Sequence, residues 1–347
     1  MKSVKEIISE SEKKIAKAID TSDINGPTPG TANAITPRQE LDGVILSIAN
    51  RMTPFRDRVT RKAGVGSAFT FNLRSSLFAS GESADPRKAV YGDGALPQAK
   101  SSKYYTKTSA YKAIGYSGSV TGLAQAQGAA LVNLYADEIE ATTRRVIQAE
   151  EWLDFWGDNS YTDPTTGEAS YDGLDALITT NVIDASGAAI SKSLIDQACN
   201  LIGQQGGSAT HIFTSFRVSD QISNLYDSSM SVTVVNGESR DNLIYGNRVK
   251  RILTSIGELE IVPDFFINAG NTYPLSNGAT STPSGAATST IFVLAMPYIE
   301  MIDLQSLGME ELGRTADKRE FYVNEYTALK LKAEPWCAKI TNVKDTL

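Results

Sequence analysis

The sequence is poor in the residues from which metal sites and disulfide frameworks are built. It contains two cysteines and one histidine among 347 residues, and these make no recognisable zinc ligand set. Cys199 and Cys337 have apolar neighbours, so we expect both to be buried free thiols, as in a protein of a reducing compartment. His211 lies within the apolar pattern "THIFTS", where we expect a structural role.

Long apolar runs and a basic charge excess are also missing. No run approaches the roughly 18 residues of a membrane span, and the first twenty residues lack the apolar core of a signal peptide. We therefore expect no membrane association and a chain that stays where it is made. The formal net charge of −7 argues against a general nucleic-acid binder, which normally carries a basic patch.

The motifs of common enzyme classes are incomplete. No Walker-type phosphate loop occurs, and "GVGSAF" at Gly64 supplies only a G-x-G. The stretch "GYSGS" around Ser117 has Ser119 where the hydrolase elbow G-x-S-x-G needs glycine, and His211 would be its only histidine base. We predict that the chain is not an enzyme and binds no cofactor.

The polar stretch "DNSYTDPTTGEA" resembles a calcium loop only in composition. Counted from Asp158, position six is Asp163 and position twelve is Ala169, where an EF-hand needs Gly and a bidentate Glu. We therefore interpret the stretch as a structural junction and predict no metal site.

The N-terminal residues combine a helical pattern with a flexible connection. In residues 2–20 an apolar stripe predicts an amphipathic helix that needs a partner, formed by Val4, Ile8, Ile15 and Ile19. The following "TSDINGPTPGTANAITP" is typical of an extended arm. A short helix is expected from Gln39 to Ala49.

Residues 64–122 contain two alternating stretches around a turn-rich segment and predict a long two-stranded excursion. Between Arg74 and Lys112 there are seven Lys or Arg against three acids, with several tyrosines between them. This composition suits stacking and phosphate contacts with single-stranded nucleic acid. It suits docking on another subunit as well, and the acidic balance of the whole chain favours docking. The candidate contact residues are Arg87, Lys88 and Tyr91.

A very long helix is predicted from Ala126 to Trp156, because its apolar positions recur every three or four residues. About thirty residues at 1.5 Å per residue give a rod of roughly 45 Å. We expect its polar face to be solvated; this face comprises Asp137, Glu140, Arg144, Gln148, Glu151 and Asp154.

The remaining chain alternates between helix and strand patterns. A helix capped by Ser191 or Ser193 ends before Gly206, a strand covers "ATHIFTS", and a second helix runs from Phe216 to Tyr226. A hairpin turns near Gly257, and an uncharged loop follows from Gly270 to Thr290. The C-terminal quarter is rich in strand patterns. We expect an α/β subdomain followed by closing strands.

This order of parts resembles the major capsid proteins of tailed bacteriophages, which have the α+β Hong Kong 97-type fold. The resemblance rests on "RMTPFRDRV", "YGDGALP", "YSGSVTGLAQA", "AEEWLDFWGDNSYTDPTTGEASYDGL", "VKRILTSIGELEIVPDFFI" and "EPWCAKITNV". It implies an N-terminal arm over 1–47, an extended loop over 64–122, a spine helix over 123–157, a peripheral domain over 158–194 and 296–347, and an axial domain over 195–295. The stretch after Trp156 would then join the spine helix to the peripheral domain.

The resemblance also implies a function: self-assembly through hexamers and pentamers into an icosahedral shell, built in the host cytoplasm and ending in the virion. The shell would enclose double-stranded DNA without sequence-specific binding. The N-terminal segment is too short for a large built-in scaffolding domain, so scaffolding, like portal and decoration proteins, would be separate or unnecessary. Some members cross-link through a Lys and an Asn; neither can be assigned here, so we expect no cross-link. The alternatives are an encapsulin-like nanocompartment shell and, from another class, a hydrolase or single-stranded nucleic-acid binder.

Overall fold

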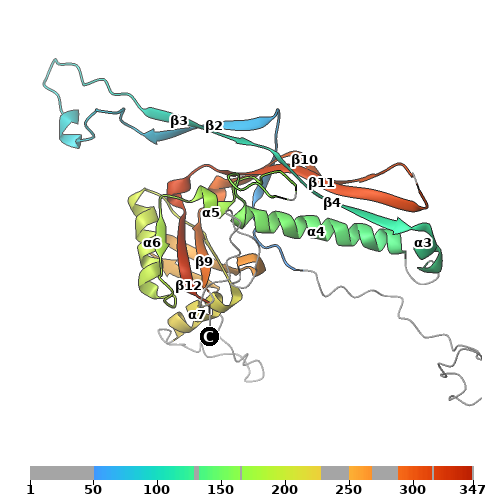
Figure 1. The fold of residues 1–347 in the computed structure, drawn as a ribbon. Helices are drawn as coiled ribbons and strands as arrows, with labels where there is room; N and C mark the ends of the chain where they lie inside the picture. The colour runs from blue at the N-terminus through green and yellow to red at the C-terminus, as the bar shows by residue number, and fades with distance from the viewer. Residues whose placement is uncertain are drawn as a thin grey trace, which may run out of the picture.

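The chain is organised around a long helix, α4, with one β-sheet along the helix and a second near its C-terminal end, as the computed structural model shows (Figure 1). The structure describes residues 51–128, 133–164, 166–227, 250–267, 288–314 and 316–345. Its helices are α3 (Gly122–Gly128), α4 (Leu134–Trp156), α5 (Leu174–Leu177), α6 (Lys192–Gln204) and α7 (Phe216–Asp227). Its strands are β1 (Thr60–Ala63), β2 (Ala68–Ser76), β3 (Lys103–Ala110), β4 (Lys112–Thr121), β5 (Val182–Asp184), β6 (His211–Thr214), β7 (Arg251–Thr254), β8 (Gly257–Pro263), β9 (Thr288–Leu294), β10 (Ile299–Glu311), β11 (Lys318–Leu331) and β12 (Ala338–Lys344). Short 3-10 helices lie at Pro86–Ala89, Phe265–Ile267, Met296–Tyr298 and Glu334–Trp336.

Helix α4 lies along a four-stranded sheet of order β1-β10-β11-β4 and packs on β4 and β11. Its N-terminus is capped by Asn133, whose side chain accepts a hydrogen bond from the Ala136 backbone N–H. The predicted C-terminal end at Trp156 is confirmed. The predicted start is not, because α3 and α4 are separate helices on either side of residues 129–132, which lie outside the described ranges.

Strands β2 and β3 form a two-stranded ribbon that projects from the body of the molecule (Figure 1). Their antiparallel register runs from Ala68 opposite Ala110 to Ser76 opposite Lys103. The prediction that residues 64–122 form one two-stranded excursion is wrong for its last part. Strand β4 leaves the ribbon and pairs with β11 beside α4, where it can bury Ile114.

A second, six-stranded sheet has the order β5-β12-β9-β6-β8-β7 and carries α6 and α7. The Ser191 side chain accepts a hydrogen bond from the Leu194 N–H and so caps α6, and Gly206 follows the helix with φ +75°. Strands β7 and β8 form a hairpin whose turn ends at Gly257. This residue has φ +124°, a conformation that favours glycine. These predicted local features are confirmed.

The six-stranded sheet combines segments far apart in the chain. Strands β5 and β12 come from 182–184 and 338–344, whereas β6, β7, β8 and β9 come from 211–294. The sheet therefore joins β5 and β12, which the resemblance assigns to the peripheral domain, to β6, β7, β8 and β9, which it assigns to the axial domain.

Aromatic packing connects α4 to the six-stranded sheet. Phe155 of α4 lies 5.0 Å from Phe55, 5.9 Å from Phe213 and 5.4 Å from Phe292, measured between ring centroids. All four rings are fully buried. Edge-on and tilted ring pairs at these distances stabilise a core beyond the apolar area that they bury.

Both cysteines are fully buried free thiols, as predicted. Burial raises the pKa of Cys337 to about 12, so this side chain stays a neutral thiol. No helix of the described ranges is both long and apolar enough to cross a membrane.

Several predicted elements lie outside the described residues. They are the helices over 2–20 and 39–49, with Val4, Ile8, Ile15 and Ile19, and residues 270–287 of the predicted loop. The last residues of that loop, from Thr288, belong to β9.

Candidate functional site

The tip of the ribbon presents apolar side chains to solvent. Leu77, Val90 and Leu96 are 66%, 82% and 91% exposed. Tyr91, a predicted contact residue, is 59% exposed. A two-stranded ribbon is marginal in water unless another surface covers it, and clustered exposed apolar side chains mark interaction sites. The tip is therefore suited to contact another protein surface.

Polar contacts within the subunit hold the ribbon in shape. The Thr106 hydroxyl donates to Asn72 Oδ1 over 2.7 Å, and Arg74 donates to the Tyr104 hydroxyl over 2.7 Å. Nearer the tip, the Glu82 carboxylate accepts hydrogen bonds from the backbone N–H and hydroxyl of Ser101. These bonds link the two arms of the ribbon directly.

Arg87, a candidate contact residue, has an ion-pair partner within the subunit. Arg87 pairs with Asp85 of its own chain, with Nη2 2.8 Å from Oδ2. The Asp85 carboxylate also accepts from the Arg87 N–H and caps the short 3-10 helix Pro86–Ala89. This hydrogen bonding raises the pKa of Arg87 and lowers the pKa of Asp85. Arg87, Lys88 and Tyr91 are all exposed and stay predicted contact residues.

Beneath α4 lies a buried group of charged side chains, which we call the charged clamp. Its members are Arg56, Arg61, Glu150, Glu151, Asp154, Asp303 and Glu325. Arg61 Nη1 lies 2.7 Å from Glu150 Oε1, and its Nε lies 2.7 Å from Asp303 Oδ2. Arg56 pairs with Glu150 as well. The clamp joins β1, α4, β10 and β11.

The clamp also holds the backbone of the segment before β1. The two oxygens of Glu151 accept hydrogen bonds from the N–H groups of Phe55 and Arg56, each over 2.8 Å. Asp154 accepts one from the Tyr171 hydroxyl over 2.7 Å. Both side chains are 0% exposed. The bonds satisfy both oxygens of Glu151 and one oxygen of Asp154, which would otherwise be costly to bury.

The clamp has more carboxylates than cations, and this imbalance changes their protonation. Burial, the hydrogen bond that Glu151 donates to Asp264 and the charge of Asp264 raise the pKa of Glu151 to about 10. Burial and the charge of Glu150 raise the pKa of Glu325 to about 8 and that of Asp154 well above its ordinary value. Glu151 and Glu325 are therefore mainly protonated at pH 7.

The prediction of a solvated polar face on the long helix is wrong for this part of α4. Glu151 and Asp154 are fully buried, because residues 53–61 and strand β11 cover that face. Glu140 and Arg144, one helical turn or more earlier, do form an exposed i,i+4 pair. The sequence offered one weak signal for the burial: "EEWLDFW" places large apolar residues between its acids.

The structure does not assemble the hydrolase candidates. Ser117 lies on β4 opposite Tyr322, whereas His211 lies on β6 of the other sheet. The His211 Nδ1 lies 2.8 Å from Thr210 Oγ1, and burial lowers its pKa. In the described ranges, no group of three His, Cys, Asp or Glu could hold a metal ion.

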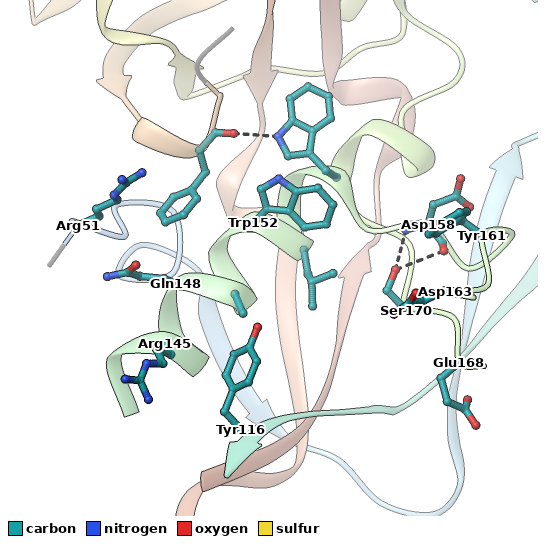
Figure 2. Close-up of a pocket in the computed structure, with 14 residues that line it drawn as sticks. Arg51, Tyr116, Arg145, Gln148, Trp152, Asp158, Tyr161, Asp163, Glu168 and Ser170 are labelled. Carbon is teal, nitrogen blue, oxygen red and sulfur yellow. Dashed lines mark hydrogen bonds between the residues drawn. The ribbon is translucent and has the colours of Figure 1, made fainter. Parts of the chain in front are cut away.

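A groove of about 790 Å³ runs along the C-terminal half of α4. The sequence did not predict this groove. Its floor contains Trp152 and Trp156, and the indole N–H of Trp156 donates to the Phe266 carbonyl over 2.9 Å. Figure 2 shows Arg51 and Arg145 on one side of the two indoles and the loop containing Asp158, Tyr161 and Asp163 on the other. The groove is mainly aromatic with charged edges.

Comparison with known proteins identifies the family. The profile described as SU10 major capsid protein matches residues 22–344. A curated relative, a putative major capsid protein of Enterococcus phage phiEF24C, is 30% identical over 139 residues. That alignment covers 38% of this chain and 29% of the relative, so the matched part is under a third of the relative's length.

Solved structures of similar fold come from phage capsids and from an encapsulin. The capsid asymmetric unit of cyanophage A-1(L) matches with a TM-score of 0.62 at 11% identity, over 88% of this chain and 97% of that chain. The holo-SrpI encapsulin complex of Synechococcus elongatus matches with a TM-score of 0.58 at 8% identity, over 89% and 94%. The capsid of Myoviridae phage XM1 matches with a TM-score of 0.53 at 12% identity, over 88% and 97%. At these identities the matches show the fold alone, which is the Hong Kong 97-type capsid fold. The profile match spans nearly the whole chain, and the chain therefore belongs to the SU10 major capsid protein family.

Proposed function

We propose that the chain is the repeated subunit of an icosahedral phage shell, built from its hexamers and pentamers around double-stranded DNA. The observation that supports this best is the projecting ribbon with an uncovered apolar tip, in a chain of a major capsid protein family. Such a ribbon gains most of its stabilisation by docking on a neighbour.

The parts of the subunit then take the following roles. Residues 1–47 act as an N-terminal arm whose stripe of Val4, Ile8, Ile15 and Ile19 contacts neighbours. Within 64–122, the ribbon of β2 and β3 supplies the extended loop, while β4 belongs to the sheet beside α4. Residues 123–157 are the spine, 158–194 and 296–347 the peripheral domain, and 195–295 the axial domain. Strands β5 and β12 connect the last two through a shared sheet.

The net charge of the chain supports a shell that does not bind the enclosed DNA tightly. A net charge of −7 gives no general attraction to DNA phosphates, so enclosure without sequence-specific binding is the expected relation. Scaffolding, portal and decoration proteins are candidate partners in addition to the chain itself.

The decisive experiment shortens the ribbon. Replacing Ser80 to Leu96 by an Asn-Gly turn should leave a folded subunit with nearly unchanged circular dichroism and abolish or distort the shells seen by electron microscopy and sedimentation. A milder variant, Val90→Ser with Leu96→Ser, should weaken assembly in the same direction. The matched control is Leu253→Ser, which removes an 85% exposed apolar side chain from the six-stranded sheet.

Normal particles from the shortened variant would contradict the proposal. Single-stranded nucleic-acid binding that is lost with the ribbon and weakens steeply with salt would favour the rival function. The fold shared with an encapsulin leaves a nanocompartment as the second candidate; terminase and portal genes beside this one would favour the phage shell.

A further inference from the structure

The groove along α4 lies where the described part of the chain begins. Arg51, the first described residue, lines the groove, and its guanidinium carbon lies 3.5 Å from the centroid of the Phe265 ring. Fifty residues precede it. The segment before Arg51 is therefore joined to the described chain at the groove.

The residues just before Arg51 carry an apolar stripe of suitable spacing. Leu41, Val44, Ile45 and Ile48 follow the i, i+3, i+4, i+7 pattern of one helix face. Ile48 is three residues from Arg51, so it lies within about 10 Å of that residue even if the chain is fully extended. The stripe is thus tethered beside the aromatic floor of the groove.

The lengths of the two partners also agree. The α4 residues that line the groove run from Arg145 to Trp156, a span of about 16 Å at 1.5 Å per residue. A helix over residues 39–49 would have about the same length by the same rise. Tethering at such short range gives an effective concentration of the order of millimolar, which favours a contact within the chain over one between chains.

The groove has the chemistry to accept this face. Trp152, Trp156 and Phe266 offer aromatic surface, while Arg51 and Arg145 border one edge (Figure 2). The groove also has an acidic side, formed by Asp158 and Asp163. Glu40 and Asp42 flank the start of the apolar stripe, so the segment fits with these two acids toward Arg51 and Arg145.

We propose that residues 39–49 of the same chain occupy the groove, with Leu41, Val44, Ile45 and Ile48 against Trp152 and Trp156. This contact anchors the base of the N-terminal arm on the spine helix, and residues 1–20 act on neighbours from that fixed point. The proposal concerns the single subunit and does not depend on shell assembly.

Disulfide trapping in the full-length chain tests the proposal. Ala149→Cys places a small thiol in the groove, and it is combined in separate variants with Ile45→Cys or Ile48→Cys. The control combines Ala149→Cys with Ser47→Cys, which lies about 200° around the helix from Ile45. The native cysteines are fully buried and do not compete.

We expect at least one stripe pair to form an intrachain disulfide under mild oxidation at least tenfold faster than the control pair, as measured by non-reducing gels and peptide mass spectrometry. Rates for both stripe pairs no higher than the control would overturn the proposal. Disulfides found mainly between chains would also overturn it, because they would show that the groove is occupied by residues 39–49 of a neighbouring copy.

A second measurement covers the case in which a cysteine pair perturbs folding. Ile45→Asp should increase acrylamide quenching of tryptophan fluorescence at least twofold over Ser47→Asp, because it would displace the cover of Trp152 and Trp156. Equal quenching in the two aspartate variants would contradict the proposal.

Discussion

Replacing Arg61 by methionine should remove the main cation of the charged clamp and leave the clamp carboxylates uncompensated. Arg61 contacts Glu150, Asp303 and Glu325. Burial alone would lower the pKa of Arg61, but the hydrogen bonds and charges of Asp303 and Glu150 outweigh it and raise the pKa. The guanidinium is therefore charged at every accessible pH, and Met keeps most of its apolar stem.

The expected loss is large because the partners are buried. Removing one member of a buried, hydrogen-bonded charge pair typically costs about 3 to 5 kcal/mol. Arg61 is 26% exposed whereas Glu150 and Glu325 are 0% exposed, so water can replace only part of what is lost. We expect the free energy of unfolding to fall by about 3 kcal/mol at pH 7.

Arg144→Met is the matched control, since Arg144, like Arg61, pairs with a glutamate of α4. Arg144 pairs with Glu140 across an exposed i,i+4 turn, where a pair contributes about 0.3 to 0.5 kcal/mol. Urea unfolding followed by circular dichroism measures both variants.

The difference should also depend on pH. Glu325 has a pKa of about 8, which the charge of Arg61 lowers, so the loss caused by Arg61→Met should grow between pH 7 and pH 9, where Glu325 loses its proton. A loss under about 1 kcal/mol at pH 7, well below the usual cost for a buried pair, would refute the view that Arg61 neutralises buried charge. A loss that does not change with pH would refute it too.

Two further predictions concern Glu325 of β11 and Gly157 at the C-terminal end of α4. The pKa of Glu325 is raised from 4.5 to about 8 in the folded state, so the folded state binds the proton more tightly and stability is lost as pH rises between these values. Glu325→Gln should therefore remove up to about 1.4 kcal/mol per pH unit of this decline, measured by urea unfolding at pH 5, 6, 7 and 8; an unchanged slope would contradict it. Gly157→Ala should destabilise the subunit by about 1 to 3 kcal/mol, because a Cβ there would lie 2.4 Å from the Tyr171 carbonyl oxygen. Thermal unfolding measures this loss, and Gly167→Ala, at an open position with positive φ, separates close approach from backbone strain.

Features set by neighbouring residues were predictable from the sequence. The Ser191 cap, the turn at Gly257 and the end of the long helix at Trp156 each depend on local hydrogen bonding or backbone conformation. The order of these elements was enough to suggest the capsid fold.

Features set by distant residues were not predictable. Arg61 and Asp303 are 242 residues apart, and only their contact shows that one polar face of the helix is covered. Glu151 and Asp154 look the same in the sequence as Glu140, which is exposed. Strand β4 has the same alternating pattern as β3, but its partner is β11 rather than the ribbon. Apolar periodicity shows that two faces of a helix or strand differ in polarity. It does not show which other element covers either face.

The body and the ribbon of the subunit are stabilised in different ways, and this difference predicts where copies in a shell will differ. The body has fully buried aromatic packing and a clamp whose separation would expose uncompensated charge, so it resists rearrangement. The ribbon has polar bonds between its own arms and an uncovered apolar tip, so its direction can change without disturbing the core.

We therefore expect five-fold and six-fold copies to superpose closely over α4 and the clamp, with the Arg61–Glu150 and Arg61–Asp303 contacts kept in both. Their differences should lie in β2, β3 and the tip between them. An electron cryomicroscopy reconstruction that resolves both environments can measure this directly. Clamp contacts broken in one environment, with the ribbon unchanged relative to the body, would show that the subunit adapts through its spine and that the division argued from burial is wrong.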